Sequence, residues 1–274
     1  MNDGPPPPWT RGPNPGGSTT RSRLPPGLGG GGGPSRPTYA VVIPALDEED
    51  AIGGAVTELL TFAHSEAVPA TLTTVYVVDN GSTDHTAARA AAAGATVVSE
   101  PHRGYGRACL SGVLAAGDVE LIVLMDGDGS DRPDGLPHLL APLLRGEADL
   151  VVGSRTAGSY EPGSLLPQQL VGNWIASRLL RFLYGVRISD IGPFRVVRRR
   201  DLLALGMREM TYGWSVEMIA RAAKAGLRVR EVPVAYRRRA GGTSKVSGNL
   251  RASVRAGSRI IATILRCRFG RDRR

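Results

Sequence analysis

The stretch Leu121-Ile122-Val123-Leu124-Met125-Asp126-Gly127-Asp128-Gly129-Ser130-Asp131 decides how the rest of the chain is interpreted. A short apolar run bounded by turn residues is typical of a buried strand. Here the run ends in aspartates, and in open α/β sheets ligands bind outside the carboxyl ends of the strands. Carboxylates this close together repel one another unless a positive group joins them. A hard divalent cation, held by one or two of these carboxylates and by substrate phosphates, would supply that charge.

The sequence does not match two other known motifs with acidic or glycine-rich turns, the EF-hand loop and the dinucleotide-binding fingerprint. An EF-hand loop starting at Asp126 needs glycine sixth and glutamate twelfth, where this chain has Asp131 and Pro137. The run 103–109, Arg-Gly-Tyr-Gly-Arg-Ala-Cys, lacks the third small residue of a dinucleotide fingerprint and follows the third predicted strand, not the first. A helix start flanked by Arg103 and Arg107 nevertheless suits an anion.

Composition narrows the class of partner. Lysine and arginine number 34 against 25 acidic residues, which gives a net charge of +9 and favours anionic partners. Aromatic residues are only 5%, which disfavours base stacking, so no nucleic acid is expected. The two cysteines show no metal or redox spacing, and no apolar run reaches the roughly 18 residues of a membrane span. We expect a cytoplasmic protein that can also lie peripherally on the membrane face.

The chain divides into three parts. Residues 1–37 are rich in proline and glycine and predict a disordered arm. Residues 38–250 alternate strands with helices, which predicts a single α/β domain with a mostly parallel central sheet and helices on both faces. Residues 251–274 form a basic amphipathic helix and tail, with Arg255 and Arg259 between apolar positions. That helix either binds a membrane surface or packs on its own domain.

Three further groups of residues are candidates for a site. Asp79 and Asn80 end a predicted strand and could bind a nucleobase edge, although turn chemistry explains them equally well. Glu217 is an acid within an apolar stretch, which suggests either a tuned site group or an exposed helix acid. The segment 237–245 is cationic and contains glycines, which suits a lid over phosphates or a solvated basic loop.

Together these motifs resemble the family 2 glycosyltransferases of the GT-A fold, and most of all the dolichyl- or polyprenyl-phosphate mannose synthase branch. The resemblance covers about residues 38–250, and five elements occur in the family's order. They are residues 42–49 (VIPALDEE), 77–84 (VVDNGSTD), 126–128 (DGD), 153–155 (GSR) and Arg239 through Lys245. The family usually has Asn at Asp47, Ala at Gly127, and Ser-Gly-Phe-Arg where this chain has Ile-Gly-Pro-Phe-Arg.

The resemblance implies a role for each matching residue. The metal, Mg²⁺ or Mn²⁺, would be held by Asp126 and Asp128. A catalytic role would fall to Asp128. Apart from the resemblance, a hydroxyl acceptor would need a base, and Glu217 or Asp190 are our candidates for it. Phosphates would be bound by Arg239 and Lys245. The nucleotide sugar would be bound by Pro44, Ala45, Leu46, Glu48, Asp79, Asn80, Arg103, Arg107, Gly127 and Arg155.

The predicted function is metal-dependent, inverting transfer of a hexose from a nucleotide sugar, GDP-mannose or a UDP-sugar, to polyprenyl phosphate or another acceptor. A sugar-phosphate nucleotidyltransferase is the main alternative, but it would carry a glycine-rich loop with lysine after the first strand. Residues 44–48 are acidic and contain no glycine. A non-catalytic basic protein on the membrane surface is the third possibility.

Overall fold

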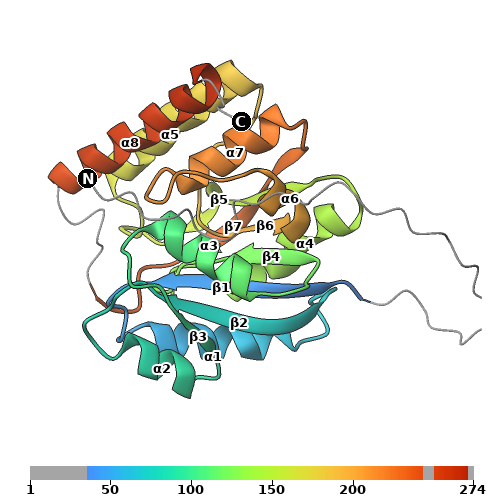
Figure 1. The fold of residues 1–274 in the computed structure, drawn as a ribbon, viewed down its shortest axis with the longest axis vertical. Coiled ribbons are helices and arrows are strands. Elements are labelled where there is room, and N and C mark those ends of the chain that lie inside the picture. Colours follow the sequence, from blue (N-terminus) through green and yellow to red (C-terminus); the bar gives the residue numbers. More distant parts are fainter. Residues whose placement is uncertain (1–35, 243–249, 271–274) are drawn as a thin grey trace, which may run out of the picture. The chain divides into compact units, whose positions relative to one another are not determined.

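Seven strands form one mixed sheet in the order β3-β2-β1-β4-β6-β5-β7 (Figure 1). The computed structural model describes residues 36–242 and 250–270, so the predicted arm, apart from its last two residues, and Lys245 lie outside the described residues. Strand β6 is antiparallel to both its neighbours, and the other pairs are parallel. The strands are β1 Thr38–Ala45, β2 Thr71–Asp79, β3 Thr96–Ser99, β4 Leu121–Leu124, β5 Leu150–Tyr160, β6 Arg195–Arg198 and β7 Val229–Tyr236.

Helices cover both faces of this sheet, which confirms the predicted α/β class (Figure 1). One hydrophobic cluster joins the sheet to α1, α2 and α4, and the other joins it to α3, α5, α6, α7 and α8. The helices are α1 Ile52–Ala63, α2 Thr86–Ala92, α3 Tyr105–Ala115, α4 Leu136–Leu144, α5 Pro167–Tyr184, α6 Arg199–Ala204, α7 Trp214–Lys224 and α8 Leu250–Phe269.

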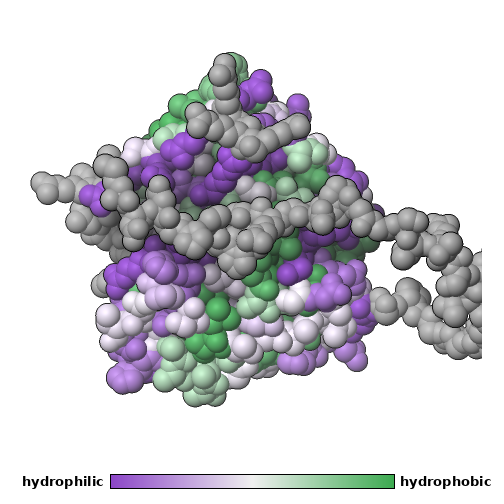
Figure 2. All heavy atoms as spheres, in the orientation of Figure 1, coloured by the Kyte–Doolittle hydropathy of each residue, from purple (hydrophilic) through white to green (hydrophobic). Residues whose placement is uncertain are grey.

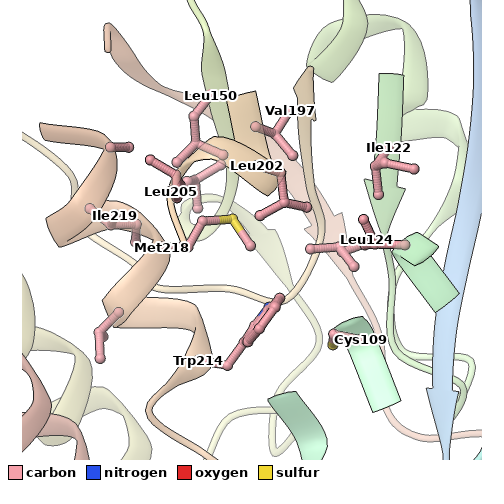
Figure 3. Packing of buried hydrophobic residues seen from close by; sticks show 14 of the residues in the cluster. Cys109, Ile122, Leu124, Leu150, Val197, Leu202, Leu205, Trp214, Met218 and Ile219 are labelled. Carbon is pink, nitrogen blue, oxygen red and sulfur yellow. The ribbon is translucent and has the colours of Figure 1, made fainter. Parts of the chain in front are cut away.

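Strand alternation produces the two clusters. Val42 and Leu124 face the cluster with α3 and α7, whereas Val41 and Val123, one residue earlier, face α1 and α4. Trp214 points from the start of α7 toward α3 and the end of β4 (Figure 3). Because β1 and β4 are buried on both faces, they consist of continuous apolar runs, as central parallel strands do.

The acidic segment 47–50 does not open a helix as its charge pattern suggests. Helix α1 begins at Ile52, and the acids form a loop between β1 and α1. Asp47 has a φ of 48°, and its backbone N–H donates to Ser82 Oγ at 3.0 Å, while Thr83 N donates to Asp47 Oδ1 at 2.8 Å. Contacts with the loop after β2 therefore hold these acids at the carboxyl edge of the sheet.

Helices α5 and α8 pack against each other, and Tyr184 Oη donates to the backbone carbonyl of Ile264 at 2.7 Å. Figure 2 shows hydrophilic residues gathered over this region, with hydrophobic residues beside them. Within residues 36–242 and 250–270, no helix has both the length and the apolar character required to cross a membrane. Among the residues of this pair whose side chains the structure describes, five large apolar ones are at least 40% exposed: Val171, Trp174, Phe182, Leu265 and Phe269.

Candidate active site

The predicted site residues converge where β1, β2 and β4 end. Ala45 at the end of β1 pairs with Asp79 at the end of β2, and Asp126 follows β4, the other neighbour of β1. Pro44, Leu46 and Glu48 belong to the same edge. A Cβ on Gly127 would lie 3.1 Å from both Ile43 and Ile52, so the aspartate turn packs tightly against β1 and α1. Parallel strand order therefore assembles residues that are up to 83 positions apart in sequence, from Pro44 to Gly127.

Three aspartates crowd the turn after β4. Asp128 is 6% exposed and Asp131 only 1%. Asp131 Oδ2 accepts the backbone N–H of Asp126 at 3.0 Å, and Asp128 Oδ1 accepts that of Ser130 at 2.9 Å. Burial raises the pKa of Asp126 well above its usual value, and the charges of Asp131 and Asp128 add to the effect. Burial, reinforced by Asp128, also raises the pKa of Asp131 to about 7.

This turn suits a divalent cation. Asp131 Oδ1 is buried and has no hydrogen-bond partner in the described part of the chain, which is unusual for a carboxylate oxygen. A cation would relieve the mutual repulsion that raises the pKa values of Asp126 and Asp131. Within the described ranges, no three His, Cys, Asp or Glu side chains are placed to hold a metal by themselves. A bound ion would therefore need oxygens from a diphosphate, which is how Mg²⁺ commonly binds.

Arg239 lies directly over these carboxylates. Its Nη1 donates to Asp128 Oδ2 at 2.8 Å, and its Nη2 donates to both carboxylate oxygens of Glu48 at 2.7 Å. Ala240 N also donates to the Asp128 carbonyl at 3.0 Å, so segment 237–242 runs along the aspartate turn. The guanidinium predicted to bind phosphate thus bridges two acids to which the same resemblance gives roles at the nucleotide sugar and the metal.

Arg155 and Asp190 form a buried ion pair. Asp190 Oδ2 accepts Arg155 Nε at 2.7 Å and Arg155 N at 3.0 Å. Asp190 Oδ1 accepts Arg155 Nη2 at 2.8 Å and Asn173 Nδ2 at 2.7 Å. The guanidinium also lies 5.0 Å from the centre of the Tyr236 ring. Both oxygens of Asp190 are engaged, so we correct its assignment from a base to a residue that positions Arg155.

Glu217 also differs from its predicted role as a base. Its side chain is 3% exposed, and its Oε1 accepts Arg221 Nε at 2.7 Å. Its Oε2 accepts the backbone N–H groups of Arg208 at 3.0 Å and Glu209 at 2.6 Å. A carboxylate with both oxygens engaged in this way stabilises the turn before α7. The apolar neighbours correctly indicated a buried acid, but not its partners.

Asn80 holds the loop between β3 and α3. The side chain is 4% exposed, and its Nδ2 donates to the carbonyls of Glu100 at 3.0 Å and His102 at 2.9 Å. Its Oδ1 accepts Gly104 N at 2.7 Å. Since both ends of the amide bind backbone, the Asn80 side chain positions the start of α3.

The cations near α3 are more accessible than Asn80. Arg103 is exposed, and its Nη2 donates to the Gly81 carbonyl at 3.2 Å. Arg107 is half-buried, and its Nε has no hydrogen-bond partner among the described residues. Asp79 Oδ1 accepts Ser82 N at 3.1 Å. Asp79, Arg103 and Arg107 therefore flank the same loop.

The sequence did not single out two polar residues close to the aspartates. Tyr105, in the first turn of α3, donates from its Oη to Asp126 Oδ1 at 3.4 Å. Arg195 is 1% exposed and donates to the backbone carbonyls of residues 191, 192, 193 and 215. The signal for Tyr105 was an aromatic residue between two glycines at a helix start. The signal for Arg195 was a cation in an otherwise apolar strand.

Fold and site together define an α/β protein with an acidic turn after a central strand, suited to a nucleoside diphosphate and a cation. The sequence profile of Glycosyl transferase family 2 matches residues 40–206. The chain belongs to this family, and it is a glycosyltransferase. Family membership decides against the nucleotidyltransferase and the non-catalytic protein that the motifs had left open.

Similar proteins agree with this assignment. An uncharacterized glycosyltransferase of Mycobacterium tuberculosis is 43% identical over 216 residues, which cover 78% of this chain and 92% of the relative. The undecaprenyl-phosphate mannosyltransferase of Micrococcus luteus is 32% identical, with 71% and 88% covered. One solved structure is that of glucosyl-3-phosphoglycerate synthase from M. tuberculosis in complex with Mn²⁺, UDP-glucose and phosphoglyceric acid. It superposes on this chain with a TM-score of 0.66 at 26% sequence identity, and the match covers 85% of this chain and 80% of the synthase. These matches confirm the GT-A fold.

Proposed function

We propose that this glycosyltransferase transfers a hexose from a nucleotide sugar to a polyprenyl phosphate at a membrane surface, with a divalent cation on the donor diphosphate. The observation that carries the proposal is the carboxylate cluster of Asp126, Asp128 and Asp131, with Arg239 above it. The undecaprenyl-phosphate relative and the solved Mn²⁺ and UDP-glucose complex support the acceptor and donor classes.

In this mechanism Asp126 and Asp128 would hold the cation, and Asp131 orients Asp126 by accepting its backbone N–H. The cation, when bound, offsets the charge that builds on the departing nucleoside diphosphate. Arg239 exchanges its contacts with Asp128 and Glu48 for diphosphate oxygens and adds a second positive charge there. The acceptor oxygen attacks the anomeric carbon from the opposite face and inverts that centre.

The state of the two proposed bases favours a phosphate acceptor. A hydroxyl acceptor needs a base to remove its proton, whereas a phosphate oxygen is already ionised. Asp190 and Glu217 both have their oxygens engaged in structural hydrogen bonds. The Arg155 guanidinium is hydrogen-bonded to Asp190 and lies over the Tyr236 ring. We assign Arg155 the role of binding a phosphate of the acceptor or of the donor.

The exposed surface of α5 and α8 fits a peripheral membrane position. Trp174 is 59% exposed and Phe182 is 85% exposed on α5, which also carries Arg178 and Arg181. Apolar side chains beside cations favour anionic lipid surfaces. Arg259, which the helix pattern grouped with the membrane-facing cations, instead pairs with the buried Glu209.

The test is calorimetric titration of the full chain with GDP-mannose and UDP-glucose, with and without Mn²⁺, followed by transfer to a short-chain polyprenyl phosphate. We expect Mn²⁺-dependent binding of one donor and formation of a sugar-phosphate lipid. Asp128→Asn should remove the dependence on Mn²⁺, with unfolding temperature as the control for folding. Unchanged Mn²⁺-dependent transfer by this variant would refute the assignment of the site.

A further inference from the structure

The loop between α6 and α7 contacts the start of α3 at unusually short range. The backbone N–H of Arg107 donates to the carbonyl of Met210 at 3.1 Å. A Cβ on Gly104 would lie 2.4 Å from Met210 O, and one on Gly106 would lie 2.5 Å from Glu209 O. Real Cβ atoms do not approach backbone oxygens this closely, so the two glycines permit the loop to lie directly against α3.

On its other side the same loop is fastened to α8 through Glu209. The Glu209 side chain is buried, and its Oε2 accepts Arg259 Nε at 2.9 Å while its Oε1 accepts Arg259 Nη2 at 3.1 Å. Its Oε1 also accepts Thr211 N at 3.1 Å and Thr211 Oγ1 at 2.5 Å. Thr263 of α8 adds a longer hydrogen bond, at 3.4 Å, to Oε2. One carboxylate thus joins the loop to the C-terminal helix.

The start of α3 connects the 207–213 loop to the acidic turn after β4. Tyr105 Oη donates to Asp126 Oδ1, and Arg107, two residues further along α3, has an Nε without a hydrogen-bond partner among the described residues. Trp214, which follows the loop, packs in the same cluster as Cys109 of α3 (Figure 3). A displacement of the loop would therefore move Tyr105 and Arg107 relative to Asp126.

We propose that Glu209 is a positioning residue for the nucleotide-diphosphate site, acting from α8 through the 207–213 loop and the start of α3. The inference rests on the proposed function of that site. In this proposal α8 helps to position the nucleotide-diphosphate site, in addition to its proposed role at the membrane surface. Glu209 touches neither substrate nor metal, and its effect passes through Met210 and Tyr105.

The decisive variant is Glu209→Gln, which keeps the size of the side chain. In the variant, an NH₂ group replaces one of the two carboxylate oxygens. Both oxygens of Glu209 accept N–H groups, so this NH₂ would face another hydrogen-bond donor wherever it lies. We expect the dissociation constants of the nucleotide sugar and of Mn²⁺ to rise by about 3- to 30-fold, the range typical of residues that act through intervening contacts. The value of kcat at saturating donor should change less than KM.

A second measurement does not depend on any ligand. Hydrogen exchange of the 104–108 backbone, which includes the Arg107 N–H held by Met210, should accelerate in Glu209→Gln without donor or metal. Arg259→Gln should reproduce both effects, and Arg259→Lys, which keeps the charge but not the two-pronged geometry, should give intermediate values.

Asp149→Asn is the matched control. Asp149 also accepts two guanidinium hydrogen bonds and a backbone N–H, from Arg228, but it precedes β5 at the opposite edge of the sheet. We expect it to leave donor KM and exchange at 104–108 unchanged. If Glu209→Gln lowers thermal stability but behaves like Asp149→Asn in both measurements, the inference is wrong. If the wild-type chain binds no nucleotide sugar, the proposed function fails first and this inference fails with it, whatever the exchange data show.

Discussion

Replacing Asp190 by asparagine should strongly destabilise the protein, because it leaves the buried Arg155 without its counter-ion. The Arg155 side chain is 10% exposed and that of Asp190 is fully buried. Each Asp190 oxygen accepts two N–H groups. An asparagine must point its NH₂ at one of these pairs of donors, so two hydrogen bonds are lost and two donors are opposed by a third.

Breaking a buried ion pair by removing one partner typically costs about 3–5 kcal/mol. For a domain of this size, each kcal/mol lowers the melting temperature by about 2–4 °C, so we expect a decrease of about 6–20 °C. Urea unfolding followed by tryptophan fluorescence and calorimetric melting would both measure the loss. The two methods should agree if unfolding is two-state.

A double variant tests the reasoning. Arg155→Met combined with Asp190→Leu replaces both charges by apolar side chains and should recover most of the lost stability, since no unpaired charge stays buried. Asp149→Asn, at the exposed Arg228 pair, should have a much smaller effect. If Asp190→Asn were as stable as the wild type, or the double variant were less stable than either single one, the Asp190 carboxylate would not be serving Arg155.

Three further outcomes can be checked with simple assays. Burial raises the pKa of the Cys109 thiol, so in the native protein Ellman's reagent should label only Cys267, and both after unfolding; rapid labelling of both without denaturant would contradict the packing. Although burial raises the pKa of Glu209, hydrogen bonds from its arginine and threonine partners lower it below the usual 4.5, so this carboxylate stabilises the fold at neutral pH and ceases to do so as the pH falls below 4.5. The unfolding free energy of Glu209→Gln should therefore decline less in acid than that of the wild type, and parallel curves would contradict this. Replacing Trp174 and Phe182 by serine should reduce flotation with anionic vesicles while soluble donor binding is retained; unchanged flotation would exclude this surface.

Several parts of the site could be predicted because each depends on a short segment. Three such segments lie at boundaries between apolar runs and turns. They are the acidic turn after β4, Asp79 and Asn80 at the end of β2, and the Gly-Tyr-Gly start of α3. In a parallel sheet such boundaries must meet at one edge. The order of motifs also identified the family, since each carries several specific residues at fixed spacing.

Partner choice could not be predicted in the same way. The sequence marked Asp190, Glu217 and Asn80 as candidate site residues, but whether such a polar group is available for chemistry depends on which hydrogen-bond partners surround it. Arg221 lies four residues from Glu217 on the same helix, a spacing that a sequence does suggest. The other donors come from positions 8 to 35 residues away, such as Glu209 for Glu217 and Arg155 for Asp190, and no spacing rule links these pairs.

The sequence by itself determined the α/β class, the family and the acidic turn, because local hydrophobic periodicity and turn chemistry specify strands and their ends. Only the tertiary structure decided which acids are free to act. It engaged Asp190 and Glu217 in hydrogen bonds, placed Arg239 between Asp128 and Glu48, and fixed α8 to the start of α3 through Glu209. The physical reason is that a buried carboxylate must find donors wherever the fold brings them, and those donors determine whether it binds, positions or reacts.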